Sequence, residues 1–367
     1  MSKRDIRLDT LRGILLVIMT LNHLGVMVTR EPFGFVSAAE GFILLSAYTF
    51  AITSRVAHAS FGAMLTSAAR RARKIYKYHV LTFAFLLLVV LAVPAYDRYF
   101  GRTFVDDVSV MESVTGVLLL VHQPKYFDIL PMYIVFALLT PALLFAMHRR
   151  LGALVLAASI ALWMAGQVFD PVPAIAEASG ISERAGFFNL LSWQLLWITG
   201  LYLGFAHKHQ NRTDLLPSKA SMAVAAGIVV FCLLARYGVI DLPRMMRVYF
   251  DKTDLGFFRF ANVIAQLTLL LGLLRLVRRE RGLPWFSFIG AHSLQVFAFH
   301  IVVVYLMTPL AIQLPKQYGV VVNLGFDMLV AASLSLPALL HRAVLRRRAR
   351  AADPAAPAVL AQPGPPS

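Results

Sequence analysis

The sequence predicts an all-α, polytopic membrane protein with about ten transmembrane helices. Of its 367 residues, 59% are hydrophobic and only 15% are charged, whereas soluble domains carry about 25% charged residues. The apolar residues gather into windows of about 20, the length that an α-helix needs to cross the hydrocarbon of a bilayer. Polar and basic segments separate these windows, so each window is interpreted as one span.

The predicted spans follow one another along nearly the whole chain. They cover residues 8–28, 34–54, 78–96, 127–148, 151–168, 188–206, 219–236, 255–277, 285–306 and 319–340. A further apolar stretch, 114–121, is too short to span and is expected to be re-entrant or to lie at the surface. We expect residues 1–345 to form the membrane domain. Residues 346–367, basic and then rich in Pro and Ala, are expected to form a disordered cytoplasmic tail.

The distribution of charge predicts which side of the membrane each loop occupies. The chain has 35 Lys and Arg against 19 Asp and Glu, a net charge of +16. The basic runs 70–77, 275–281 and 342–350 fall on one side if the spans alternate. The positive-inside rule then places both termini in the cytoplasm. Topology and contact with anionic lipid account for this basic excess, so no nucleic-acid partner is expected.

The first predicted span carries polar side chains on one face. On a helical wheel Asp9, Arg12, Thr20 and His23 fall within about 80° of arc, which predicts a stripe facing the bundle interior or a water-filled cavity. Arg12 and His23 are about 16 Å apart along the axis, Arg12 near the cytoplasmic face and His23 near the opposite face. Two simpler interpretations stay open: Arg12 snorkels and pairs with Asp9, and His23 is a packing residue.

Two carboxylates are candidates to orient His23. Glu40 lies about 9 Å inside the second span and His23 about 7 Å from the outer end of the first, so their depths match across a short hairpin. Asp128 lies at the outer mouth of the fourth span. An imidazole oriented by a carboxylate is a common general base. The alternative is that Glu40 pairs with an arginine such as Arg259.

The remaining polar residues of the spans fall at two depths. At the inner level a basic mouth suits an anionic, phosphate-bearing ligand; its members are Arg12, Arg70, Arg73 and His292. At the outer level amide, aromatic, basic and imidazole groups suit a sugar hydroxyl or a developing oxyanion; they are Asn189, Trp193, Arg259, Asn262 and His300. No His spacing predicts a metal site, and the single cysteine, Cys232, excludes a disulfide framework.

Several ordered blocks resemble one known family. "RDIRLDTLRG" followed by Asn22 and His23, "FGFVSAAEGFILLSAY" (33–48), "RRAR" (70–73), "YFDILPMYIV", "FNLLSWQLL", "DKTDLGFFR" and "IGAHSLQVF" occur in that order. Over residues 4–340 the chain resembles the OpgC family, the succinyltransferases of osmoregulated periplasmic glucans. That family lies within the integral-membrane O-acyltransferase superfamily, whose Arg–His signature fits Arg12 and His23.

The resemblance implies acyl transfer across the bacterial inner membrane, in which the chain would be a multi-pass protein. The donor would be a cytoplasmic acyl-CoA, such as succinyl-CoA, used as co-substrate with no bound cofactor, and the acceptor a hydroxyl of a periplasmic glucan. His23 would act as general base with Glu40 or Asp128 as its partner. The inner basic residues would hold the donor phosphates. Besides donor, acceptor and lipid, the glucan-synthesis machinery would be a partner.

Two other classes of function stay open at this stage. A transporter or permease would line its path with the same stripes and relay protons through His23. A non-catalytic membrane partner of a glucan synthase would need no general base. No internal repeat is evident in the sequence, which disfavours the inverted-repeat transporters. The acyltransferase is therefore the main hypothesis.

Overall fold

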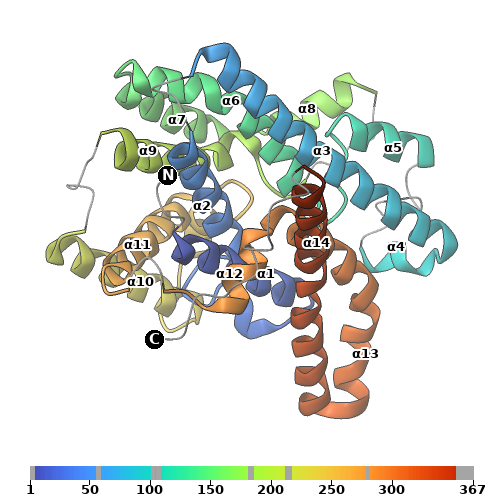
Figure 1. Cartoon of the computed structure of the whole chain (residues 1–367). Helices are drawn as coiled ribbons and strands as arrows, with labels where there is room; N and C mark the ends of the chain where they lie inside the picture. Colours follow the sequence, from blue (N-terminus) through green and yellow to red (C-terminus); the bar gives the residue numbers. More distant parts are fainter. Residues whose placement is uncertain are drawn as a thin grey trace, which may run out of the picture.

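All regular secondary structure in the described part of the protein is helical (Figure 1). The computed structural model describes residues 5–54, 59–100, 104, 109–180, 186–210, 217–277 and 281–352. The predicted all-α class is confirmed for these residues. The main helices are α1 Ile6–His23, α2 Ala38–Thr53, α3 Phe61–Ala92, α6 Ile129–His148, α7 Gly152–Gly166, α9 Leu190–His209, α10 Lys219–Arg236, α11 Phe257–Leu274, the short α12 Pro284–Ala291, α13 Ser293–Ser333 and α14 Ser335–Ala352.

Short helices connect or flank these elements. They are η1 Met27–Thr29, α4 Ala95–Tyr99, α5 Val110–Leu118, α8 Pro171–Ala178 and η2 Arg244–Phe250. Helix α5 overlaps the apolar stretch 114–121, and its 9 residues are too few to cross a bilayer. Helix α14 continues to Ala352, so the predicted tail begins as helix, while residues 353–367 lie outside the described part of the chain.

Six of the described helices are long and apolar enough to cross a membrane. They are α3, α6, α10, α11 and two segments, Ser293–Leu314 and Tyr318–Arg348; the bent pair α7 and α8 would make a seventh. These helices indicate a membrane protein. Every predicted span overlaps a helix, but α2 is shorter than a span. The number of ten and the cytoplasmic termini stay predictions.

Helix α13 contains parts of both the ninth and the tenth predicted span; the ninth begins in α12 and the tenth ends in α14. The chain runs along the first half of this helix, turns at Gly319 and returns along its second half into α14 (Figure 1). Gly319 has φ 77°, a left-handed conformation that glycine adopts without steric cost. The turn therefore separates two apolar segments, as the sequence predicted from the break between 306 and 319.

The helices that carry the polar stripe and Glu40 are held by backbone-to-backbone contacts. A Cβ atom added to Gly290 of α12 would lie 1.9 Å from the carbonyl oxygen of Asp9 on α1. One added to Gly200 of α9 would lie 2.3 Å from the carbonyl oxygen of Leu44 on α2. Small residues allow this close approach of membrane helices. Helices α1 and α2 are thus fixed by neighbours that are distant in sequence.

Candidate active site

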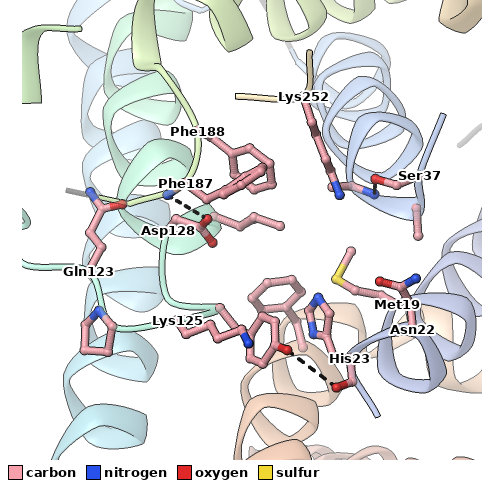
Figure 2. Close-up of a pocket in the computed structure, with 16 residues that line it drawn as sticks. Met19, Asn22, His23, Ser37, Gln123, Lys125, Asp128, Phe187, Phe188 and Lys252 are labelled. Carbon is pink, nitrogen blue, oxygen red and sulfur yellow. Dashed lines mark hydrogen bonds between the residues drawn. The ribbon is translucent and has the colours of Figure 1, made fainter. Parts of the chain in front are cut away.

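A cavity of about 740 Å³ surrounds the end of α1, and we call it the His23 cavity (Figure 2). Asn22 and His23 of α1 form one wall, and Asp128, Phe187 and Phe188 lie opposite them in Figure 2. Six parts of the sequence therefore meet here, namely 19–23, 37–39, 123–129, 187–188, 252 and 297. The last turn of α1, where the polar stripe ends, opens into this cavity.

The His23 ring is held by stacking. Its centroid lies 3.9 Å from that of Tyr126, with an angle of 17° between the planes. The Tyr126 hydroxyl also donates to the His23 carbonyl oxygen, at 3.5 Å. Tyr126 has φ 73°, a strained conformation of the kind that persists at functional sites. Among the described residues no group forms a hydrogen bond with His23 Nδ1, so a ring nitrogen stays available to a ligand.

A second imidazole lies beside the first. The His300 ring of α13 is buried, and its centroid is 5.5 Å from that of His23. His300 Nδ1 contacts the carbonyl oxygen of Phe297, a bond in which the imidazole must be the donor. Neutral His300 therefore presents Nε2 as a lone pair, and this atom has no hydrogen-bond partner in the described structure. Sequence reasoning placed His300 at the outer level, and the structure brings it next to His23.

Asp128 is the carboxylate that lines the His23 cavity. It precedes α6, and its Oδ2 accepts a hydrogen bond from the backbone N–H of Phe187 at 3.3 Å. As a buried carboxylate that faces the cavity, Asp128 can accept a hydrogen bond from a bound hydroxyl.

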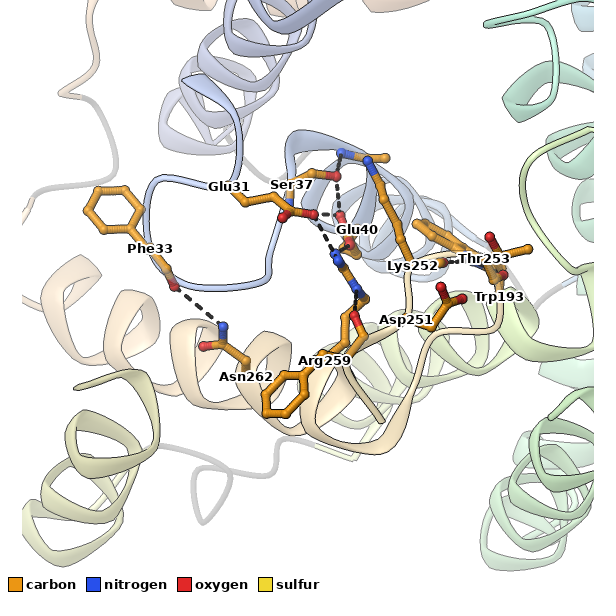
Figure 3. Close-up of polar contacts among 12 residues, drawn as sticks. Glu31, Phe33, Ser37, Glu40, Trp193, Asp251, Lys252, Thr253, Arg259 and Asn262 are labelled. Carbon is orange, nitrogen blue, oxygen red and sulfur yellow. Dashed lines mark hydrogen bonds and ion pairs between the residues drawn. The ribbon is translucent and has the colours of Figure 1, made fainter. Parts of the chain in front are cut away.

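Glu40 has other partners (Figure 3). Its Oε1 lies 2.7 Å from Arg259 Nη1, and its Oε2 accepts from the backbone N–H of Ser37 at 3.0 Å. Arg259 Nη2 lies 2.8 Å from Glu31. The sequence allows Glu40 to meet either His23 or Arg259, and the structure shows the pair with Arg259. Glu31 lies in the loop between the first two predicted spans, where no local pattern marks it as a partner of Arg259.

Three outer-level candidates are engaged by neighbouring loops. Asn189 Nδ2 donates to Gly166, Phe169 and Asp254 at 2.7 to 3.0 Å. Trp193 Nε1 donates to the carbonyl oxygens of Lys252 and Thr253, both at 3.0 Å. Asn262 lies 3.4 Å from the carbonyl oxygen of Phe33. These side chains, like Arg259, brace the walls of the site and do not line the His23 cavity.

Other lining residues are not among the site residues predicted from the sequence. They come from loops and helix ends, and include Gln123, Lys125, Tyr126, Phe187, Phe188 and Lys252. The blocks "YFDILPMY" and "DKTDLGFFR" contain two of them, and the polarity of these blocks was the available signal. Their meeting in one cavity depends on loop packing, which no periodicity predicts.

A smaller cavity of about 310 Å³, the inner cavity, lies next to the His23 cavity. Ile129 and Phe297 line both of them. The inner cavity also contains Arg12, Arg71 and Lys74. Arg12 makes an ion pair with Asp9 at 3.7 Å, as one interpretation of the sequence expected, and contacts Thr49. Ile129 and Phe297 thus separate His23 from the basic side chains of the inner cavity.

A third cavity of about 1030 Å³, the basic cavity, continues from the inner one. The two share Lys74, Gln295 and His341. The basic cavity contains the predicted Arg70 and Arg73, together with Lys77 and Arg348. The predicted His292 does not line either cavity; its Nδ1 lies 2.8 Å from Nδ1 of His341, which lines both. The three cavities form a series from a strongly basic surface to His23.

The fold and the site define a polytopic helical membrane protein with an imidazole-centred cavity joined to a basic one. The part of the chain that the structure describes holds no group of three or more His, Cys, Asp or Glu that could bind a metal ion. The family model for OpgC protein matches residues 4–345. The chain therefore belongs to the OpgC family, which is associated with transferase activity on glucans. No curated protein and no solved structure matches the chain.

Proposed function

We propose that this protein is an O-acyltransferase that moves an acyl group from acyl-CoA to a hydroxyl of a periplasmic glucan. The observation that carries the proposal is the series of three cavities, which joins a cluster of cations to His23 through shared lining residues. Family membership supports a glucan as the acceptor. In this proposal both termini lie in the cytoplasm and the helices cross the bacterial inner membrane.

The donor is proposed to extend along the cavities. Its phosphates bind in the basic cavity, where Arg70, Arg73 and Lys77 supply charge-assisted hydrogen bonds. The flexible arm passes through the inner cavity beside Arg12 and Arg71. Arg12 and His23 are separated by about 16 Å of helix, which sets the distance the arm must cover. The thioester then lies between Phe297 and His23.

The reaction proposed at His23 is attack of a hydroxyl on the thioester carbon. A ring nitrogen of His23 takes the hydroxyl proton while the oxygen forms a bond with the acyl carbon. The carbon–sulfur bond breaks, and the sulfur leaves as a thiolate that accepts the proton from the imidazolium. The products are an O-acyl glucan and free CoA. Tyr126 and His300 keep the His23 ring in place during the reaction.

The acceptor sugar is proposed to bind at the open side of the His23 cavity. Phe187 is 53% exposed there, and an exposed aromatic face can pack on the apolar face of a sugar ring. Gln123 and Asp128 offer hydrogen bonds to hydroxyl groups. The acyl group is proposed to be succinyl. The glucan-synthesis machinery is proposed as a partner that delivers the acceptor.

The test is transfer by purified full-length protein in liposomes, with acyl-CoA on one side and glucan on the other. We expect His23→Ala to abolish acyl glucan formation. The matched control is His148→Ala, which removes an exposed imidazole at the end of α6. Mass spectrometry of the glucan identifies both acyl group and acceptor. Full transfer by well-folded His23→Ala, or movement of solute without CoA release, would refute the proposal and favour a transporter.

A further inference from the structure

Among the residues that the structure describes, one cavity-lining lysine forms no ion pair with a carboxylate. Lys252 lies in the loop before α11 and lines the His23 cavity. Its backbone is fixed, because its carbonyl oxygen accepts hydrogen bonds from Trp193 Nε1 at 3.0 Å and from the N–H of Leu255 at 3.4 Å. Its half-buried side chain extends toward Ser37 at the start of α2 in both close-ups (Figures 2 and 3).

The carboxylates around Lys252 are turned to other groups. Asp251 accepts from the backbone N–H of Asp254 at 3.0 Å, and Asp254 accepts from Asn189 at 3.0 Å. Asp128 accepts from Phe187. Within the described residues, no carboxylate oxygen lies within 4.0 Å of the Lys252 ammonium.

The surroundings of the ammonium are aromatic. Lys252 Nζ lies 5.8 Å from the ring centroid of Phe188 and 6.0 Å from that of Phe187. Aromatic faces attract a cation but do not neutralise it. A fixed cation facing a cavity is an arrangement that binds an anion.

We propose that Lys252 binds the free carboxylate of a dicarboxylic acyl group and so selects the acyl group that the enzyme transfers. The inference rests on the proposed function. A carboxylate that enters a cavity lined by Met19, Ile129 and Phe297 loses its hydration and needs a cation in place. Lys252 supplies it. Arg259, the cation that sequence analysis suggested for this role, is occupied by Glu31 and Glu40.

The other cation of the cavity occupies a different position. Lys125 is exposed, and its Nζ lies 5.3 Å from the ring centroid of Tyr126 at the cavity mouth. An anionic substituent on the incoming glucan would meet Lys125 before it met Lys252. The acyl group, which arrives past Phe297, is therefore the better source of the carboxylate for Lys252, and the glucan is the alternative that the experiment must separate.

The experiment compares succinyl-CoA with butyryl-CoA, a neutral donor of the same chain length. Initial rates are measured with the full-length protein in liposomes and an uncharged glucan as acceptor. We expect Lys252→Met to lower kcat/KM for succinyl-CoA about tenfold or more, as loss of one charge-assisted hydrogen bond implies. The value for butyryl-CoA should change less than about threefold. Lys252→Arg should restore the preference, and Lys219→Met, which removes an exposed lysine of α10, should leave it unchanged.

Several results would overturn the inference. An equal loss with both donors would assign Lys252 to the acceptor or to folding. A loss that appears only with a glucan bearing anionic substituents would move the carboxylate to the acceptor. An unchanged donor preference in Lys252→Met would exclude any role in selection. Wild-type protein that transfers neither acyl group would refute the proposed function itself, which distinguishes that failure from failure of the lysine assignment.

Discussion

The buried ion pair between Glu40 and Arg259 yields the sharpest prediction. In Glu40→Gln, Arg259 would keep Glu31 at 2.8 Å but lose a carboxylate at 2.7 Å, in a place where the Glu40 and Arg259 side chains are 0% and 4% exposed. Breaking one buried pair costs about 3–5 kcal/mol. Because Glu31 remains, we expect the lower end, about 3 kcal/mol of unfolding free energy, or roughly a 100-fold change in the unfolding equilibrium.

The assay measures stability and activity on the same samples. Unfolding is followed in detergent with increasing denaturant, and transfer is expressed per folded molecule. Because Glu40 contacts Arg259 and Ser37, activity per folded molecule should fall less than tenfold, whereas His23→Ala should lose it. Glu177→Gln, at an exposed carboxylate of α8, is the control and should change stability by less than about 0.5 kcal/mol. A Glu40→Gln protein with wild-type stability and no activity would refute this reasoning and assign a catalytic role to Glu40.

Two further predictions follow from the described contacts. Gly290→Val should prevent α12 from packing on α1, because even the Cβ atom of the new side chain would lie 1.9 Å from the carbonyl oxygen of Asp9. Limited proteolysis should show the loosened fold. Tyr126→Leu should lower kcat at least tenfold by releasing the His23 ring, whereas Tyr126→Phe should keep most of it.

Hydrophobic windows predicted the helices because a segment inside a membrane must satisfy its backbone N–H and C=O groups internally, as an α-helix does. Every predicted span overlaps a helix, and angular spacing alone placed Asp9 and Arg12 together. The approximate angles of a wheel also put Arg12 and His23 on one stripe. The structure adds that they belong to two different cavities.

Tertiary packing decided the residues that the sequence could not assign. Arg70 and Arg73 were predicted from a run of cations, but Arg71 is the member that reaches the inner cavity, with its guanidinium 4.2 Å from the Phe50 ring centroid. The cation–π partner lies on another helix, so no local pattern contains it. Likewise, in the sequence Lys252 is one of several charges in a polar loop. Its place in the lining of the His23 cavity depends on the packing of this loop against α9.

The two apolar residues shared by the His23 cavity and the inner cavity have a consequence for the cell. Ile129 and Phe297 are 5% and 2% exposed, and they stand between a basic compartment and an imidazole compartment. A narrow hydrophobic neck resists wetting and stops ions. An acyltransferase of the proposed kind, open toward each side of an energised membrane, would otherwise let protons leak through it. In that proposal, Ile129 and Phe297 are expected to act as an electrical insulator between the two cavities.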